Sequence, residues 1–182
     1  MQPWSIKTVR PAQRVLNLEP LRMPVDVQEI AGCTCLRLRR ASRKLTQIYD
    51  RLLGAAGLTV NQFGLLAQLY GADVGRSTGL SMGIIAERLG LDPTTLNRNL
   101  KPLQLQGLVK DTIDAADRRV RIIRITEKGR RTLERAMPFW RQAQAQVERA
   151  LGDEAMGALN GLLDQSTIKL NALPGRAAAA YK

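Results

Sequence analysis

Residues 81–126 constrain the fold of this chain more than any other segment. Two short helical patterns are separated by a Leu-Gly-Leu sequence at residues 89–91, where the glycine tolerates positive φ and the leucines can anchor both helices. Asp92 is a good N-cap for the second helix, and Pro93 suits its first position, where a missing N–H costs nothing. Beyond Gly107, two β-branched runs follow. The segment therefore predicts a helix-turn-helix followed by a hairpin wing.

Apolar spacing within this segment predicts which side chains are buried. Ser81 should cap the first helix, and Leu80 is expected to form a very short strand before it. Residues 108–113 and 120–126 should pair as an antiparallel hairpin. The helix positions expected in the core are Ile84, Ile85, Leu89, Leu96, Leu100 and Leu103.

Helical patterns also flank the segment on both sides. One runs from residue 31 to 53, and another, capped by Thr59, should bury Phe63, Leu66, Ala67 and Tyr70. After Thr126 a long helix extends to about residue 150, and Asp153 is expected to cap a final helix. The stripe positions of the outer helices are Leu38, Ala41, Leu45, Ile48, Leu52, Leu133, Met137, Trp140, Val147, Met156, Leu159, Leu163 and Leu170.

The expected architecture is mainly α with a small β-hairpin wing, in the order α-α-(β)-α-α-β-β-α-α. Four prolines disfavour long helices before residue 31. We expect an extended arm over residues 1–30, a helical dimerisation region over 31–57 and 127–173, a winged helix-turn-helix over 58–126, and a frayed tail over 174–182.

The chain is strongly basic, with 28 Lys and Arg against 16 Asp and Glu, a net charge of +12. Such an excess favours a nucleic-acid partner when it gathers on one face. The lack of histidine excludes His-based acid–base catalysis and His metal sites. The sequence also shows no P-loop, no Gly-rich dinucleotide turn and no convergent pair of carboxylates, so we expect no enzyme activity, no cofactor and no metal. The sequence shows neither a transmembrane-length apolar run nor a secretory signal, which predicts a cytoplasmic protein without a membrane partner.

The second helix of the segment carries the side chains best suited to read bases. A recognition helix in the major groove needs short polar groups and a cation opposite its buried stripe. The residues that meet this requirement, with one on the flank near the N-terminus, are Thr94, Asn97, Arg98, Lys101 and Thr95. We expect these five to contact DNA.

At the hairpin tip, Arg118 and Arg119 lie beside Asp114 and Asp117. An exposed arginine pair on a short β-ribbon suits the narrow, electronegative minor groove. We expect both arginines to bind DNA and Asp117 to hold one guanidinium in a fixed pose.

The order of elements and the wing sequence, with Asp117-Arg118-Arg119 and the Ile-Thr-Glu-Lys-Gly run at residues 125–129, resemble the MarR family of transcriptional regulators over roughly residues 33–172. This resemblance implies a triangular homodimer with interlocked first and last helices and one winged helix per subunit. It implies that Arg119 enters the minor groove, and that a small phenolic or acidic ligand, or an oxidant, releases DNA by acting where the two domains meet.

A dimer is also expected from the residues themselves, since the first and last helices carry apolar stripes with no evident partner inside a small winged helix. Burying them against a second chain stabilises by about 25 cal/mol per Å². Two-fold symmetry would then place two recognition helices in successive major grooves about 34 Å apart, which predicts an inverted-repeat operator.

Cys33 and Cys35 are possible sensing residues. Two positions apart on one helix, they point to different sides, which disfavours a disulfide between them. A helix N-terminus and nearby arginines favour the thiolate, and Cys35 aligns with the reactive cysteine of the family's organic-peroxide sensors. Tyr49 matches one of that branch's tyrosines, whereas Arg39 and Val60 replace two others. We expect both cysteines to be buried small apolar residues or to line a ligand pocket.

We therefore expect a homodimeric, sequence-specific regulator, most simply a repressor, whose partners are double-stranded DNA and a small aromatic or acidic effector. Two alternatives remain open. One is a thiol-based redox sensor that uses Cys35, and the other is a sequence-tolerant nucleoid or RNA-binding protein.

Overall fold

The computed structural model describes residues 27–75, 79–113, 117 and 119–173. It divides into two compact units, residues 1–38 and 39–182. In the first, α1 (Val27–Ala31) is followed by the start of α2 (Thr34–Leu53). The prediction of an extended arm through residue 30 was wrong at its end, because residues 27–31 contain neither proline nor glycine and complete a short helical turn. Residues 1–26 and the expected frayed tail lie outside the described residues.

In the second unit, α3 (Val60–Val74) begins with the predicted threonine cap. Gln62 N donates to the Thr59 hydroxyl at 3.3 Å, while Thr59 N donates to Gln62 Oε1 at 3.0 Å. The two bonds satisfy two amides that a helix start leaves open. Asp50 of α2 accepts from Val60 N at 2.7 Å, which fixes the turn through the short 3₁₀ segment Gly54–Ala56.

The helix-turn-helix follows as predicted, with α4 (Met82–Leu89) and α5 (Pro93–Leu105). Ser81 accepts from Ile84 N at 3.3 Å, and Asp92 accepts from Thr95 N at 2.9 Å. Gly90 joins the helices at φ 59°, a left-handed conformation that glycine adopts without a Cβ clash.

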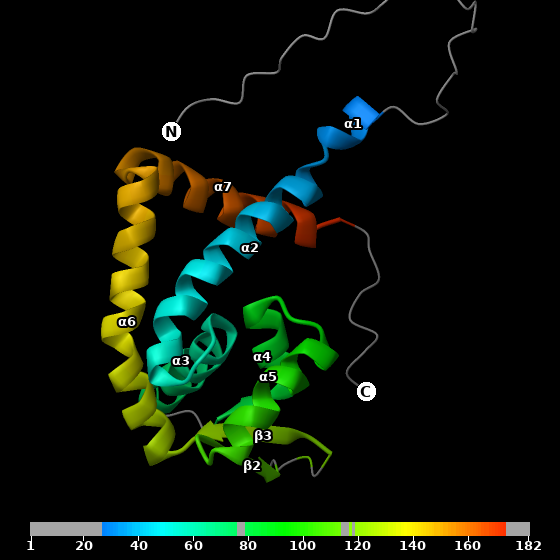
Figure 1. The fold of residues 1–182 in the computed structure, drawn as a ribbon. Coiled ribbons are helices and arrows are strands. Elements are labelled where there is room, and N and C mark those ends of the chain that lie inside the picture. Colours follow the sequence, from blue (N-terminus) through cyan, green and yellow to red (C-terminus); the bar gives the residue numbers. More distant parts are fainter. Residues whose placement is uncertain (1–26, 76–78, 114–116, 118, 174–182) are drawn as a thin grey trace, which may run out of the picture. The chain divides into compact units, whose positions relative to one another are not determined.

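The wing is part of a three-stranded antiparallel sheet in the order β1-β3-β2. Its strands are β1 (Leu80–Ser81), β2 (Val109–Ile113) and β3 (Arg121–Ile125). Val109 pairs with Ile125 and Ile113 with Arg121, which confirms the hairpin; the short first strand pairs on the other edge of β3. Figure 1 shows this sheet beside α5, near the beginning of α6.

Two long helices complete the unit, α6 (Glu127–Leu151) and α7 (Asp153–Asn171). Thr126 caps α6 by accepting from Gly129 N at 3.0 Å. The predicted cap at Asp153 was wrong: Gly152, at φ 80° and ψ 156°, holds the cap position without a side-chain bond, and Asp153 is the first residue of α7. Its carboxylate still favours the positive end of the helix dipole.

The core lies between α3, α5, the sheet and α6. Phe63 and Trp140 stack with ring centroids 6.1 Å apart. The prediction that Tyr70 and Ile84 are buried was wrong, since they are 37% and 42% exposed. In α3 the buried stripe instead passes through Leu65 and Leu69, because α3 packs against several elements and its apolar face is broad.

No single helix among the described residues is both long and apolar enough to cross a membrane. One bent pair, Thr34–Ala56 with Val60–Val74, meets the criteria of length and composition at an angle of 70°. The second member of that pair is α3, whose leucines form part of the protein core.

Candidate nucleic-acid interface

Two opposite faces of α5 differ sharply in burial. Leu96, Leu100 and Leu103 are fully buried and fix the rotation of the helix against the core. The opposite side is exposed, so the helix offers a polar surface with two cations. The exposed predicted residues are Thr94, Asn97, Arg98 and Lys101. The structure thus brings these four predicted residues together on one face.

Thr95 differs from these four because it is half-buried and takes part in the cap. Its hydroxyl donates to Asp92 Oδ2 at 2.6 Å and its amide donates to Oδ1 at 2.9 Å. The hydrogen bonds from the Thr95 side chain, followed by those from the backbone, lower the pKa of the Asp92 carboxyl. Thr95 therefore holds the first turn of α5 in shape.

Asn97 is exposed but already bonded within its own helix. Its Nδ2 donates to the carbonyl of Pro93 at 2.9 Å. An amide nitrogen carries two hydrogens, so this bond orients the group and leaves a second donor and the amide oxygen. That pair is what an adenine edge requires.

At the wing tip, Asp117 organises the backbone. Its Oδ1 accepts from Arg119 N at 2.9 Å, and its carbonyl accepts from Val120 N at 2.9 Å. An aspartate that bonds the chain two residues on forms an Asx turn, which fixes the direction in which Arg119 leaves the tip. Arg119 is exposed. Arg118 and Asp114 lie outside the described residues.

Sequence reasoning missed a cluster that joins α5 to the wing. Gln104 Nε2 donates to Asp111 Oδ1 at 2.6 Å, and Arg121 Nε donates to Asp111 Oδ2 at 3.1 Å. Arg121 and Asp111 also form a salt bridge through Nη2. The only signal in the sequence was an acidic residue, Asp111, on the first predicted strand of the hairpin and a basic residue, Arg121, on the second.

The base of the wing is anchored where β3 turns into α6. The Thr126 hydroxyl donates to the carbonyl of Gly107 at 2.8 Å, and Lys128 Nζ donates to that of Gln106 at 2.8 Å. Further along α6, Arg130 donates to Asp73 Oδ2 of α3 at 2.6 Å. These bonds connect the start of α6 both to the end of α5 and to α3.

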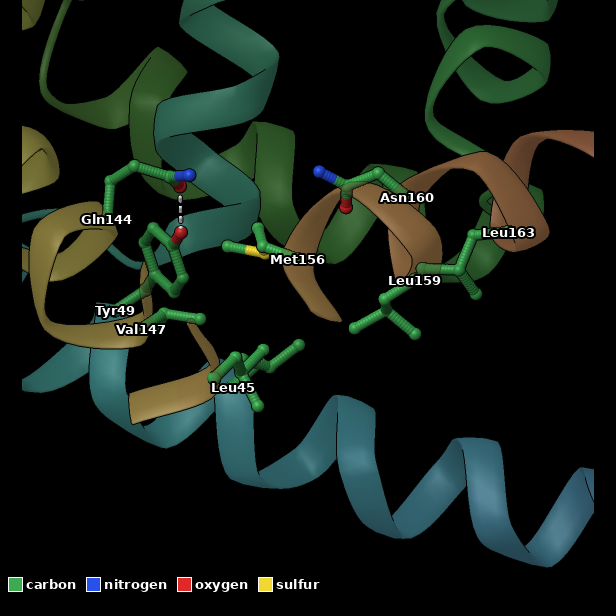
Figure 2. A pocket seen from close by; sticks show the side chains of 9 residues that line it. Leu45, Tyr49, Gln144, Val147, Met156, Leu159, Asn160 and Leu163 are labelled. Atoms are coloured by element: carbon green, nitrogen blue, oxygen red, sulfur yellow. Dashed lines mark hydrogen bonds between the residues drawn. The ribbon is translucent and has the colours of Figure 1, made fainter. Parts of the chain in front are cut away.

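A cavity of about 170 Å³ lies among α2, α6 and α7, shown in Figure 2. The Tyr49 hydroxyl donates to Gln144 Oε1, and Gln144 Nε2 donates to Glu148 Oε1 at 2.9 Å. Burial, together with the charge of Glu148, raises the pKa of Tyr49, so its hydroxyl stays protonated. The lining residues are Leu45, Tyr49, Gln144, Val147, Leu151, Met156, Leu159, Asn160 and Leu163.

The cysteines belong to the first unit and are both free thiols. Cys33 is half-buried in the turn before α2, and Cys35 is exposed on α2. The expectation that both are buried was therefore wrong, and neither cysteine is among the residues that line the cavity of Figure 2. Within the described part of the chain, no group of three or more Cys, Asp or Glu side chains has the arrangement of a metal site.

Comparison with known proteins identifies relatives of this architecture. Residues 56–120 match the model of the MarR family. The organic hydroperoxide resistance transcriptional regulator of Bacillus subtilis is 30% identical over 112 residues, which cover 62% of this chain and 73% of that protein.

Three solved structures are also similar, two of them complexes with DNA. The Mycobacterium tuberculosis transcriptional regulator MosR in complex with DNA aligns at a TM-score of 0.64 and 36% identity, covering 78% of this chain and all of that one. The repressor CouR bound to a 23-mer duplex aligns at 0.65 and 26%, covering 79% and 98%. CouR from Rhodococcus jostii RHA1 bound to p-coumaroyl-CoA aligns at 0.60 and 25%, covering 76% and 93%.

Proposed function

Because the chain belongs to the MarR family of winged-helix transcriptional regulators that bind DNA, we propose that it is a homodimeric repressor of an inverted-repeat operator, released by a small molecule. The observation that carries this proposal is the exposed face of α5, set opposite a fully buried leucine stripe and next to the wing. In this function Asn97 and Arg98 read base edges in the major groove, and Thr94 and Lys101 contact the backbone. Arg119, with Arg118, enters the minor groove.

The exposed apolar face of α7 supports the homodimer. None of the residues of α7, all of which the structure describes, is buried, although the helix carries large aliphatic side chains. Leu162, Ile168 and Leu170 are each more than 60% exposed. Exposed apolar surface of this kind is typical of an interface. In the first unit, Val27 and Leu36 are exposed as well, which fits an interface that includes α1 and α2.

Selection from a random-sequence duplex pool tests the operator. We expect the protein to enrich an inverted repeat whose half-site centres lie about one helical turn, 10–10.5 base pairs, apart. If the protein instead binds the enriched duplex and a scrambled duplex with equal affinity at fixed salt, it is a sequence-tolerant nucleoid or RNA-binding protein.

We further propose that the effector occupies the cavity among α2, α6 and α7 and is neutral. A cavity of about 150 Å³ holds one benzene ring, so this one suits a single-ring compound. Its described lining offers Tyr49, Gln144 and Asn160 for hydrogen bonds, and it contains no lysine or arginine to bind a carboxylate. Glu148, bonded to Gln144, would repel an anion. Of the aromatic and acidic effectors expected from the sequence, the cavity thus favours the aromatic class.

Thermal-shift titration with phenol and benzoate tests this site. Phenol should raise the melting temperature and benzoate should not. Leu159→Trp, which fills the cavity, should abolish the shift, whereas Leu162→Trp on the exposed side of the same helix should retain it. A benzoate shift that survives Leu159→Trp would place the effector elsewhere.

A second candidate function is thiol-based sensing through Cys35. It is favoured by the exposure of this thiol and by similarity to a relative named for organic hydroperoxide resistance. A hydroperoxide would oxidise the Cys35 thiolate to a sulfenic acid and leave as the alcohol. If this is the signal, cumene hydroperoxide should release the duplex from wild type and not from Cys35→Ser. Release of both, or of neither, counts against it.

A further inference from the structure

The carboxylate of Asp111 on β2 connects two elements that the proposed function assigns to different grooves. One oxygen, Oδ1, accepts from Gln104 Nε2 of α5 at 2.6 Å. The other, Oδ2, accepts from Arg121 of β3, from Nε at 3.1 Å and also from Nη2. One side chain therefore holds α5 on one side and the second strand of the wing on the other.

The strand register explains why this pair can form. Asp111 lies opposite Ile123 and Arg121 lies opposite Ile113, so the two charged residues are diagonal neighbours across the hairpin. A diagonal separation is within reach of long side chains such as arginine. Gln104 lies in the last turn of α5, seven residues before Asp111, and reaches back to it across the turn.

The cluster contributes little to the stability of the fold. The side chains of Arg121 and Asp111 are 51% and 36% exposed, and pairs this exposed typically contribute at most about 1 kcal/mol. The core leucines of α5 and the ladder between β2 and β3 hold the unit together without them. A role for Asp111 in DNA binding can therefore be separated from a role in folding.

Considered only as a charge, Asp111 should lower the affinity for DNA. It lies between the two proposed DNA-reading elements, and a carboxylate close to phosphates repels them. Removing its charge should then tighten binding. If Asp111 instead holds the wing in place, removing it should weaken binding. Without the connection the wing can turn relative to α5, and one of the two groove contacts is misaligned.

We propose that Asp111 is a positioning residue that fixes the angle between the recognition helix and the wing, so that both enter their grooves together. This inference rests on the proposed DNA-binding mode of α5 and the wing. Gln104 and Arg121 act through Asp111 and set its two contacts.

The substitution Asp111→Ala tests the proposal, with the duplex that wild type enriches from the random pool as the probe. The alanine removes the charge together with both acceptor oxygens, so the contacts to Gln104 and Arg121 are lost. We expect affinity at fixed salt to fall about ten-fold, equivalent to about 1.4 kcal/mol at 25 °C, with a melting temperature no more than about 4 °C below that of wild type. Hydroxyl-radical footprints should lose protection in the minor groove at the wing while dimethyl-sulfate protection of the major groove persists.

Two further variants sharpen the result. Glu87→Gln removes one exposed carboxylate from α4 in the same winged helix and should bind as tightly as wild type or more tightly. Combining Asp111→Arg with Arg121→Asp reverses the pair at constant net charge, and the amide of Gln104 can turn its oxygen toward the new guanidinium. This double variant should recover most of the affinity that each single change loses.

The outcomes separate this inference from the proposed function. If wild type enriches no duplex, the proposed function fails, and the inference fails with it. If wild type binds selectively while Asp111→Ala binds equally well or more tightly, only the positioning role is overturned. An unaltered footprint at the wing in that variant would overturn it as well.

Discussion

At Gly129 the start of α6 passes so close to the backbone of Leu108, the residue before β2, that there is no room for a side chain. A Cβ built there would lie 2.1 Å from the carbonyl oxygen of Leu108 and 2.8 Å from Cγ1 of Ile125. Relief requires backbone movement, because the nearest atom belongs to the main chain. We expect Gly129→Ala to lower the free energy of unfolding by about 1–3 kcal/mol, the usual cost of overpacking.

Urea denaturation measures this change. Gly71→Ala in α3 is the matched control, since nothing lies within 4 Å of its Cβ position and alanine has the better helix propensity. That variant should be as stable as wild type or more stable. Equal stability of the two alanine variants would show that α6 does not approach Leu108 as described.

Asp92 should make the start of α5 sensitive to acid. Its pKa is lowered from the usual 3.8, chiefly by hydrogen bonds from Thr95, so the folded state favours the ionised carboxyl. A depressed pKa contributes stability above the unfolded value and loses it as the pH falls through the folded value. The melting temperature of wild type should exceed that of Asp92→Asn near pH 6, and the difference should shrink below pH 3.8. A difference that stays constant from pH 6 to pH 3 would contradict this.

Single residues were predictable from the sequence where one local signal decides their environment. The caps at Thr59, Ser81 and Asp92 follow from side-chain oxygens that precede a helical pattern, and all three are confirmed. Tyr70 and Ile84 were wrongly placed in the core because periodicity gives the position of a stripe and not its width. Contacts between elements, such as Gln104 with Asp111, depend on how the hairpin lies against α5, which no local pattern encodes.

At the scale of elements, the helix-turn-helix and hairpin were predictable because their boundaries carry caps, a glycine turn and a change of period from helix to strand. The short strand at Leu80 was predicted as well, but its place beside β3 was not, because that pairing depends on the tertiary structure. The buried and exposed faces of α5 were predicted correctly because its leucine stripe is narrow and fully buried. The DNA contacts of the exposed face stay a prediction. The cavity that we propose as the effector site was not predictable, since it combines side chains from three helices, α2, α6 and α7.

The helix α7 exposes large apolar side chains and buries none of its residues. Ile168 is 72% exposed, and we propose that it packs against a second copy of the chain. Ile168→Asp should therefore weaken the dimer by about ten-fold or more, because burying an unpaired charge is costly. Light scattering coupled to size exclusion measures the mass over a dilution series, and far-UV circular dichroism verifies the helix content. Gln165→Asp, an acidic change at an exposed polar position of the same helix, should remain dimeric. A dimer unaffected by Ile168→Asp would move the interface away from this face.

At the scale of the whole molecule, a net charge of +12 and two-fold symmetry should act together on DNA binding. Each phosphate contact that is lost reduces the slope of log K against log salt by about 0.9. In a homodimer every substitution occurs twice, so Lys101→Ala should reduce the magnitude of the slope by about 1.8, twice that value. A protein that binds DNA as a monomer would show half of that change.

Thr94→Val removes a hydroxyl without altering charge, and its slope should match wild type. Fluorescence anisotropy of the selected duplex between roughly 50 and 200 mM salt, a range in which such binding changes strongly, measures all three proteins. A Lys101→Ala slope equal to that of wild type would remove this lysine from the phosphate contacts, and a change of about 0.9 would exclude symmetric engagement of two half-sites.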